Sequence, residues 1–163
     1  DEISAAPEAE HLPLTPRDRF LSVYRGILHT LREKGIRPIL MTLPPIDAER
    51  YFAFIGRAGN NLQNILRWLG DVQRIYRFHE SYSNAVWHLA REEKCDLVDV
   101  RAYFLDQRNY RDLIGIDGLH PTSEGYRLIG QAFADVDPQT RPEQLSVQDW
   151  GRLTDAVDAL RAG

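Results

Sequence analysis

The stretch LREKGIRPILMTLPPI, residues 31–46, decides the fold class of this chain. Its centre, Ile36 to Leu43, is a compact apolar run, with Gly35 before it and Pro44 and Pro45 after it. The run is too short for a helix of its own and is apolar on both faces, which is typical of a buried strand in a parallel sheet. We therefore expect a parallel strand here.

A helix is expected upstream of this strand, from Thr15 to Gly35. Thr15 is a suitable N-cap, and Pro16 suits the first turn. One face of this helix carries the apolar side chains of Phe20, Tyr24, Ile27, Leu28 and Leu31. Residues 1–14 have no periodic pattern and predict an extended arm or the end of a loop.

The segment after the strand, residues 47–59, has no clear period and predicts a surface loop. It carries Tyr51, Phe52 and Phe54, which are too apolar to lie in water. We interpret these three aromatic residues as candidate substrate contacts, because they follow a strand end. The alternative is that these side chains only pack beneath a long loop and do not contact a substrate.

The rest of the chain continues the alternation of helices and strands. Asn61 and Asp71 are expected to cap two helices, and residues 96–100 predict a second strand. A polar connection is expected over residues 106–112, a helix beginning at Thr122, and a linker and last helix over residues 136–163. This order predicts an α/β fold, with helices on both faces of a parallel sheet and ligands at the carboxyl ends of its strands.

Composition and charge exclude several classes of protein. The chain has 163 residues, enough for about one domain, and its hydrophobic share of 43% is ordinary for a globular protein. A net charge of −4 without a basic run gives no sign of nucleic-acid binding, and no apolar stretch is long enough to span a membrane. The single cysteine, Cys95, excludes an intrachain disulfide and suits the cytoplasm, with secretion as the alternative.

The motif IDGLHPTSEG, residues 116–125, is the strongest candidate for chemistry. It places Asp117 and His120 three residues apart, before a helix. A histidine that acts as general base needs a carboxylate to fix its tautomer and to stabilise the imidazolium. The alternative is a plain Asp-Gly turn followed by a surface histidine, and the spacing alone does not decide between them. No metal-binding or nucleotide-binding motif is present, so we expect neither a metal nor a cofactor.

With this motif the chain resembles the SGNH or GDSL-type serine hydrolases over about residues 15–135. The specific matches are Asp117, Gly118, His120 and Pro121, supported by LREKGIRPILMTLPPI and by YSNAVWHLAREEKCDLVDV at residues 82–100. The resemblance implies a three-layer α/β/α sandwich and hydrolysis of esters without a metal or cofactor. It also implies that Asp117 and His120 are the acid and base of a catalytic triad. The substrate would be a small-molecule or carbohydrate ester.

The chain departs from that family because its nucleophile and oxyanion blocks are not visible. The six serines are Ser4, Ser22, Ser81, Ser83, Ser123 and Ser146, and none of them follows Gly and Asp. Gly59, Asn60 and Asn61 only faintly echo the oxyanion block. Two convincing strands are also too few for a stable sheet.

We therefore expect no nucleophile in this chain and an amino-terminal part outside it. The only methionine, Met41, lies deep in the chain, which favours the same interpretation. The missing part would be further residues of a longer protein, a separate fragment, or a segment of a second copy that completes the sheet. The alternative to an esterase is a catalytically inactive binding or assembly module.

Overall fold

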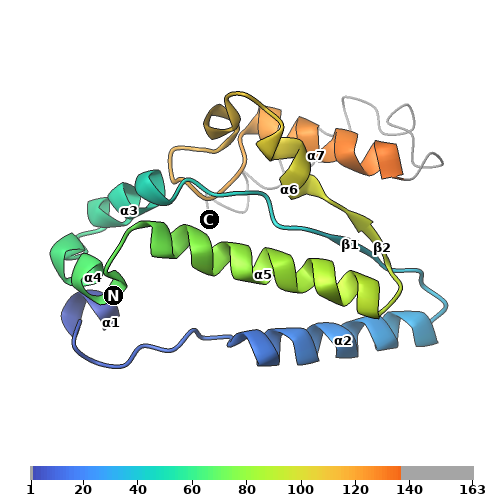
Figure 1. The fold of residues 1–163 in the computed structure, drawn as a ribbon, viewed down its shortest axis with the longest axis horizontal. Coiled ribbons are helices and arrows are strands. Elements are labelled where there is room, and N and C mark those ends of the chain that lie inside the picture. The colour runs from blue at the N-terminus through green and yellow to red at the C-terminus, as the bar shows by residue number, and fades with distance from the viewer. Residues whose placement is uncertain (1, 137–163) are drawn as a thin grey trace, which may run out of the picture.

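The computed structural model describes residues 2–136 of the chain (Figure 1). In chain order the elements are α1 (Glu2–Ala5), α2 (Arg17–Glu33), β1 (Ile39–Met41), α3 (Ala48–Arg57), α4 (Leu62–Leu69), α5 (Gln73–Glu92), β2 (Asp96–Val98), α6 (Val100–Leu105), the 3-10 helix η1 (Tyr110–Leu113) and α7 (Ser123–Val136). The helix predicted at the carboxyl-terminal end lies outside the described residues.

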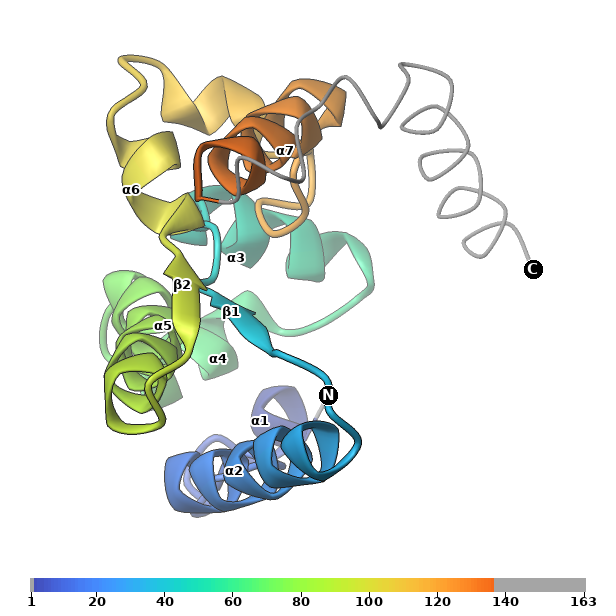
Figure 2. The same cartoon turned by 90° about the vertical axis from the view of Figure 1, so that its right-hand side faces the viewer.

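The two strands pair in parallel, with Leu40 opposite Leu97, which confirms the prediction of two parallel strands. Figures 1 and 2 place α2 and α5 on one side of this small sheet and α6 and α7 on the other. The arrangement is consistent with a three-layer α/β/α fold, of which the described residues supply two strands. Both strands are shorter than predicted.

Two hydrophobic clusters lie on the two sides of the sheet. The first joins the sheet to α2 and α5 and contains Leu28, Leu40, Val86, Leu89 and Ala90. The second joins β2 to α6 and α7 and contains Val98, Val100, Phe104, Ile114 and Ala132. Because each cluster uses a different face of the strands, helices cover the sheet on both sides.

Replacing Phe104 by alanine is expected to lower the free energy of unfolding by about 3–5 kcal/mol, because the ring is fully buried and its loss leaves a cavity. Chemical denaturation measures this change. The matched control is Phe78→Ala, at a half-exposed position, which should cost much less. Equal losses for the two variants would contradict the assignment of Phe104 to the core.

The largest correction concerns residues 47–59, where the predicted surface loop is in fact mostly the helix α3. Asp47 begins this helix, because its side chain accepts a hydrogen bond from the backbone N–H of Arg50 at 3.1 Å. Tyr51, Phe52 and Ile55 are all partly buried, which gives α3 an inward face. The aromatic residues expected on a surface loop therefore belong to a helix that packs on α4 and α5.

Smaller corrections concern the ends of elements. Pro16, rather than Thr15, is the N-cap of α2. The second strand ends at Val98, because the side chain of Asp99 caps a new helix, α6, which the sequence did not predict. The predicted cap by Asn61 is confirmed, since its side chain accepts hydrogen bonds from the backbone N–H groups of Gln63 and Asn64. The predicted amino-terminal arm contains the short helix α1.

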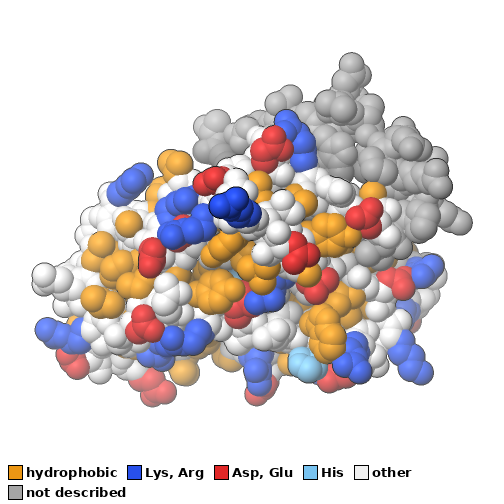
Figure 3. Space-filling view, turned by 45° about the horizontal axis from the view of Figure 1, so that its top comes forward, with side chains coloured by type: hydrophobic (Ala, Val, Ile, Leu, Met, Phe, Trp, Pro, Cys, Tyr) orange, Lys and Arg blue, Asp and Glu red, His pale blue; other side chains and the backbone are white. Residues whose placement is uncertain are grey.

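The surface mixes charged and apolar side chains. On the face drawn in Figure 3, acidic and basic groups lie among apolar ones. Among the residues that the structure describes, no helix combines the length and apolar character needed to cross a membrane.

Candidate functional site

The candidate site is the loop between η1 and α7, which is closed by backbone hydrogen bonds. Gly115 donates its N–H to the carbonyl of His120 at 2.7 Å, and Thr122 donates to the carbonyl of Leu113 at 2.8 Å. Ile114 and Pro121 form an isolated antiparallel bridge between these bonds. The loop is therefore a narrow hairpin with Asp117 near its tip.

The structure brings Asp117 and His120, the two candidate residues of the motif, into direct contact. The Nδ1 atom of His120 lies 2.5 Å from Oδ2 of Asp117. The other carboxylate oxygen, Oδ1, accepts the backbone N–H groups of Leu119 at 3.0 Å and His120 at 3.1 Å. Both oxygens of Asp117 are thus engaged, which fixes the carboxylate and, through it, the imidazole ring.

The environment keeps Asp117 ionised. Partial burial acts to raise the pKa of its carboxyl, but the hydrogen bonds from the His120 ring and from two backbone N–H groups outweigh burial and hold the pKa below its ordinary value. The His120 side chain is 52% exposed, whereas that of Asp117 is 23% exposed. The carboxylate therefore lies behind a ring that remains accessible from outside.

Gly118 allows the loop to pack closely against the start of α3. Its φ is +74°, and a Cβ at this position would lie 2.3 Å from the backbone N of Tyr51 and 2.6 Å from the carbonyl O of Asp47. The carbonyl of Gly118 also accepts the N–H of Asp47 at 2.9 Å. Any side chain here would push the loop away from α3.

Gly118→Ala is therefore expected to destabilise the protein by roughly 1–3 kcal/mol, because it adds both backbone strain and a steric clash. The matched control is Gly26→Ala, within α2, where no atom lies within 4 Å of the added Cβ. That variant should be stabilised by about 0.5–1 kcal/mol, because alanine favours helix. Thermal unfolding of both proteins compares them, and similar stability of the two variants would contradict this prediction.

The predicted substrate contacts Tyr51, Phe52 and Phe54 all lie on α3. The backbone of Tyr51 borders the candidate loop beside Gly118, and Phe54 is 37% exposed. No hydrogen bond or aromatic contact among the described residues joins these three side chains to Asp117 or His120. Their role in binding a substrate stays a prediction.

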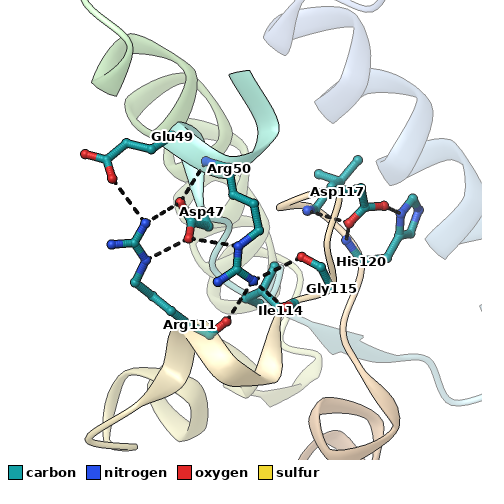
Figure 4. A network of polar contacts seen from close by, with 9 residues as sticks. Asp47, Glu49, Arg50, Arg111, Ile114, Gly115, Asp117 and His120 are labelled. Atoms are coloured by element: carbon teal, nitrogen blue, oxygen red, sulfur yellow. Dashed lines mark hydrogen bonds and ion pairs between the residues drawn. The ribbon is translucent and has the colours of Figure 1, made fainter. Parts of the chain in front are cut away.

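A charged cluster that the sequence did not predict lies beside the loop and is formed by Asp47, Arg50 and Arg111 (Figure 4). Asp47 is buried and forms ion pairs with both arginines. Its capping position after a strand, with Arg50 three residues on, is a signal that could have drawn attention to these two residues. Nothing near Arg111 in the sequence indicates that it belongs with them.

No serine among the described residues forms a hydrogen bond with the ring of His120. Ser4 bonds to the backbone N–H of Asn61, Ser81 to the carbonyl of Phe78, and the buried Ser83 to the backbone of Leu43. Across residues 2–136, no three His, Cys, Asp or Glu side chains are grouped to hold a metal ion.

Comparison with known proteins places the chain in a family. No curated protein matches the chain. Residues 6–128, however, match the sequence model of the GDSL-like lipase/acylhydrolase family, a region that includes both Asp117 and His120. Because this match extends over well more than half of the chain, the protein belongs to the GDSL-like lipase/acylhydrolase family.

Proposed function

We propose that the protein is an ester hydrolase in which His120 is the general base and Asp117 is the carboxylate that orients it. Membership of an acylhydrolase family supports hydrolysis of ester bonds. The observation that carries the assignment of roles is the 2.5 Å contact between Nδ1 of His120 and Oδ2 of Asp117. An acid and a base held in this way are two of the three groups of a catalytic triad.

In this mechanism Asp117 accepts the Nδ1–H of His120, which leaves the lone pair on Nε2 free to accept a proton. Nε2 takes the proton of a serine hydroxyl as its oxygen attacks the ester carbonyl, and the imidazolium then gives that proton to the departing alcohol. Water then attacks the acyl-enzyme while Nε2 takes a proton from it. The imidazolium gives this proton to the departing serine oxygen, which releases the acid and regenerates the serine and the neutral imidazole. The ionised Asp117 stabilises the imidazolium in both steps.

We propose that the serine and the oxyanion donors come from polypeptide outside residues 1–163. The positions of Ser4, Ser81 and Ser83, each bonded elsewhere, support this proposal. The edge of β1 supports it further. Within the described residues β1 pairs with β2 alone, and exposed apolar side chains of β1 and the neighbouring α2 include Ile39, Val23 and Ile27. A further parallel strand at that edge would cover apolar surface and extend the sheet.

The first experiment is the intact mass of the isolated protein under denaturing conditions. A mass above 18.8 kDa, or a second co-purifying chain, would show that the protein contains the further polypeptide that the mechanism needs. A single species of 18.8 kDa would contradict the external serine and favour an inactive binding or assembly module.

The direct test of the catalytic roles is replacement of His120 by alanine in the complete protein, with hydrolysis of a short-chain model ester as the readout. Unchanged turnover would contradict the proposed function.

A further inference from the structure

One buried carboxylate beside the candidate site has no part in the proposed mechanism. Asp47 lies between β1 and α3, and its side chain is only 3% exposed. Burying a charge is costly unless it is paired and hydrogen-bonded, so a carboxylate in this position needs compensating partners. The partners that it has connect α3 to the loop of Asp117 and His120.

Arg111 supplies the main compensation through two parallel hydrogen bonds. Its Nε donates to Oδ2 of Asp47 at 2.7 Å, and its Nη2 donates to Oδ1 at 2.9 Å. Arg50 adds a second positive charge, with its Nε 3.5 Å from Oδ2. Burial acts to raise the pKa of Asp47, but the hydrogen bonds and charges of the two arginines hold it below its ordinary value, so the carboxylate stays ionised.

The guanidinium of Arg50 also binds the loop directly. Its Nη1 donates to the backbone carbonyl oxygens of Arg111 at 3.0 Å, Ile114 at 2.6 Å and Gly115 at 3.1 Å. The carbonyls of Ile114 and Gly115 belong to the first arm of the hairpin that carries Asp117 and His120, whereas that of Arg111 lies in η1, just before it. Figure 4 shows Ile114 and Gly115 between the ion cluster on one side and Asp117 with His120 on the other.

The loop is therefore held at two points. Arg50 holds its beginning, and the N–H of Asp47 holds its tip through the carbonyl of Gly118 at 2.9 Å. Between these points, the N–H of Gly115 bonds to the carbonyl of His120 at 2.7 Å. A shift of Arg50 or Asp47 would move the backbone to which the imidazole is attached.

We propose that Asp47, Arg50 and Arg111 are positioning residues that fix the orientation of the His120 ring by holding its loop on α3. The proposal rests on the function proposed above. None of the three side chains forms a hydrogen bond or ion pair with the ring, so they act through the backbone of the loop. Precise placement matters, because a misplacement of about 1 Å at a reacting group can cost about 100-fold in rate.

The test uses Asp47→Asn in the complete protein. Asparagine keeps the size of the side chain and an oxygen that can cap α3, but it removes the charge that pairs with both arginines. Arg111 keeps its second ion pair, with Glu49 at 3.1 Å. We expect kcat for a model ester to fall by roughly 10- to 100-fold with KM within about twofold, because the change misplaces a base without touching substrate. Arg111→Lys, which keeps the charge and loses the paired hydrogen bonds, should give a smaller loss than Arg111→Met.

The matched control is Arg32→Gln, which removes another ion pair between two elements. Arg32 of α2 binds Glu93, just beyond α5, at 2.8 Å, and neither residue contacts the candidate loop. This control should leave kcat within about twofold of the unchanged protein. Equal kcat values for Asp47→Asn and Arg32→Gln would overturn the proposal.

A second readout does not depend on activity. The 15N chemical shifts of the His120 ring report which nitrogen carries the proton, and we expect Nδ1 in the unchanged protein because of the bond to Asp117. Asp47→Asn should increase the share of the Nε2–H tautomer severalfold, whereas Arg32→Gln should leave the ratio unchanged. If Asp47→Asn does not fold, Arg111→Lys takes its place in both measurements. A loss of kcat and a tautomer shift beyond those of Arg32→Gln would then support the proposal, and values equal to those of Arg32→Gln would overturn it.

The two readouts separate this proposal from the proposed function. A tautomer shift in a complete protein that hydrolyses no ester would support positioning and contradict the esterase. Ester hydrolysis that depends on His120, together with unchanged kcat and tautomer ratio in Asp47→Asn, would support the esterase and overturn positioning.

Discussion

Replacement of His120 by alanine should reduce kcat of the complete protein for a short-chain ester by about 10⁴-fold or more. In the proposed mechanism the imidazole takes the proton of the nucleophile and gives it to the leaving alcohol. The ring is half exposed and is held by Asp117 at 2.5 Å, so its removal takes away the base and leaves the rest of the loop in place. Steady-state hydrolysis of a chromogenic acetate ester measures the loss.

The control for this variant is His88→Ala, the same chemical change at an exposed position on α5. His88 lies against Trp87, with ring centroids 5.3 Å apart, and takes no part in the candidate loop. Both variants should keep the circular dichroism spectrum and unfolding temperature of the unchanged protein to within a few degrees. A folded His120→Ala protein that retains full kcat would exclude His120 as the base.

The contact between Asp117 and His120 could be predicted from the sequence as one of two alternatives, because it is local. The two residues are three positions apart, and Gly118 between them adopts the positive φ that the tight bend requires. The carboxylate caps the N–H groups that follow it, as an aspartate in a turn often does. The same local hydrogen bonds form in a simple Asp-Gly turn and in a turn that pairs Asp117 with His120. The sequence therefore could not distinguish the two interpretations.

The ion cluster of Asp47, Arg50 and Arg111 could not be predicted from the sequence, because it joins residues that are far apart in the chain. Asp47 and Arg111 are 64 residues apart in the chain, and only the folding of η1 against α3 brings them together. No periodic pattern or motif encodes such a pair. The helix α3 was missed for a related reason, because aromatic residues such as Tyr51, Phe52 and Phe54 have modest helix propensity. The cap from Asp47 and packing against α4 and α5 stabilise this helix.

The strands were predicted in type but not in length. An apolar run shows where a strand can form, whereas its paired length depends on the partner. Ile39 pairs with Asp96, and residues before Asp96 cannot continue the ladder, because the chain turns at Lys94, whose φ is +51°. The apolar residues before Ile39 therefore have no partner on the β2 side.

Asp117→Asn is expected to lower kcat by about 10³- to 10⁴-fold, although it changes one atom of the side chain. The remaining amide oxygen can still accept the N–H groups of Leu119 and His120, which keeps the bend intact. The amide N–H₂ that replaces Oδ2 donates a hydrogen bond, so it favours the tautomer of His120 with the proton on Nε2. That tautomer cannot accept a proton from a serine. Steady-state kinetics and the ring 15N shifts test the two consequences together.

Asp117→Asn is also expected to change how the stability of the protein depends on pH. The pKa of Asp117 in the folded protein lies below the ordinary value of 3.8, so its charged hydrogen bonds stabilise the fold above that value. This contribution is lost as the pH falls through the lower, folded-state pKa. The difference in free energy of unfolding between the unchanged protein and Asp117→Asn should therefore be full near neutral pH and shrink below pH 3.8. Asp106→Asn, at an exposed position, is the matched control, and a difference that stays constant as the solution is acidified would show that the charge of Asp117 does not stabilise the loop.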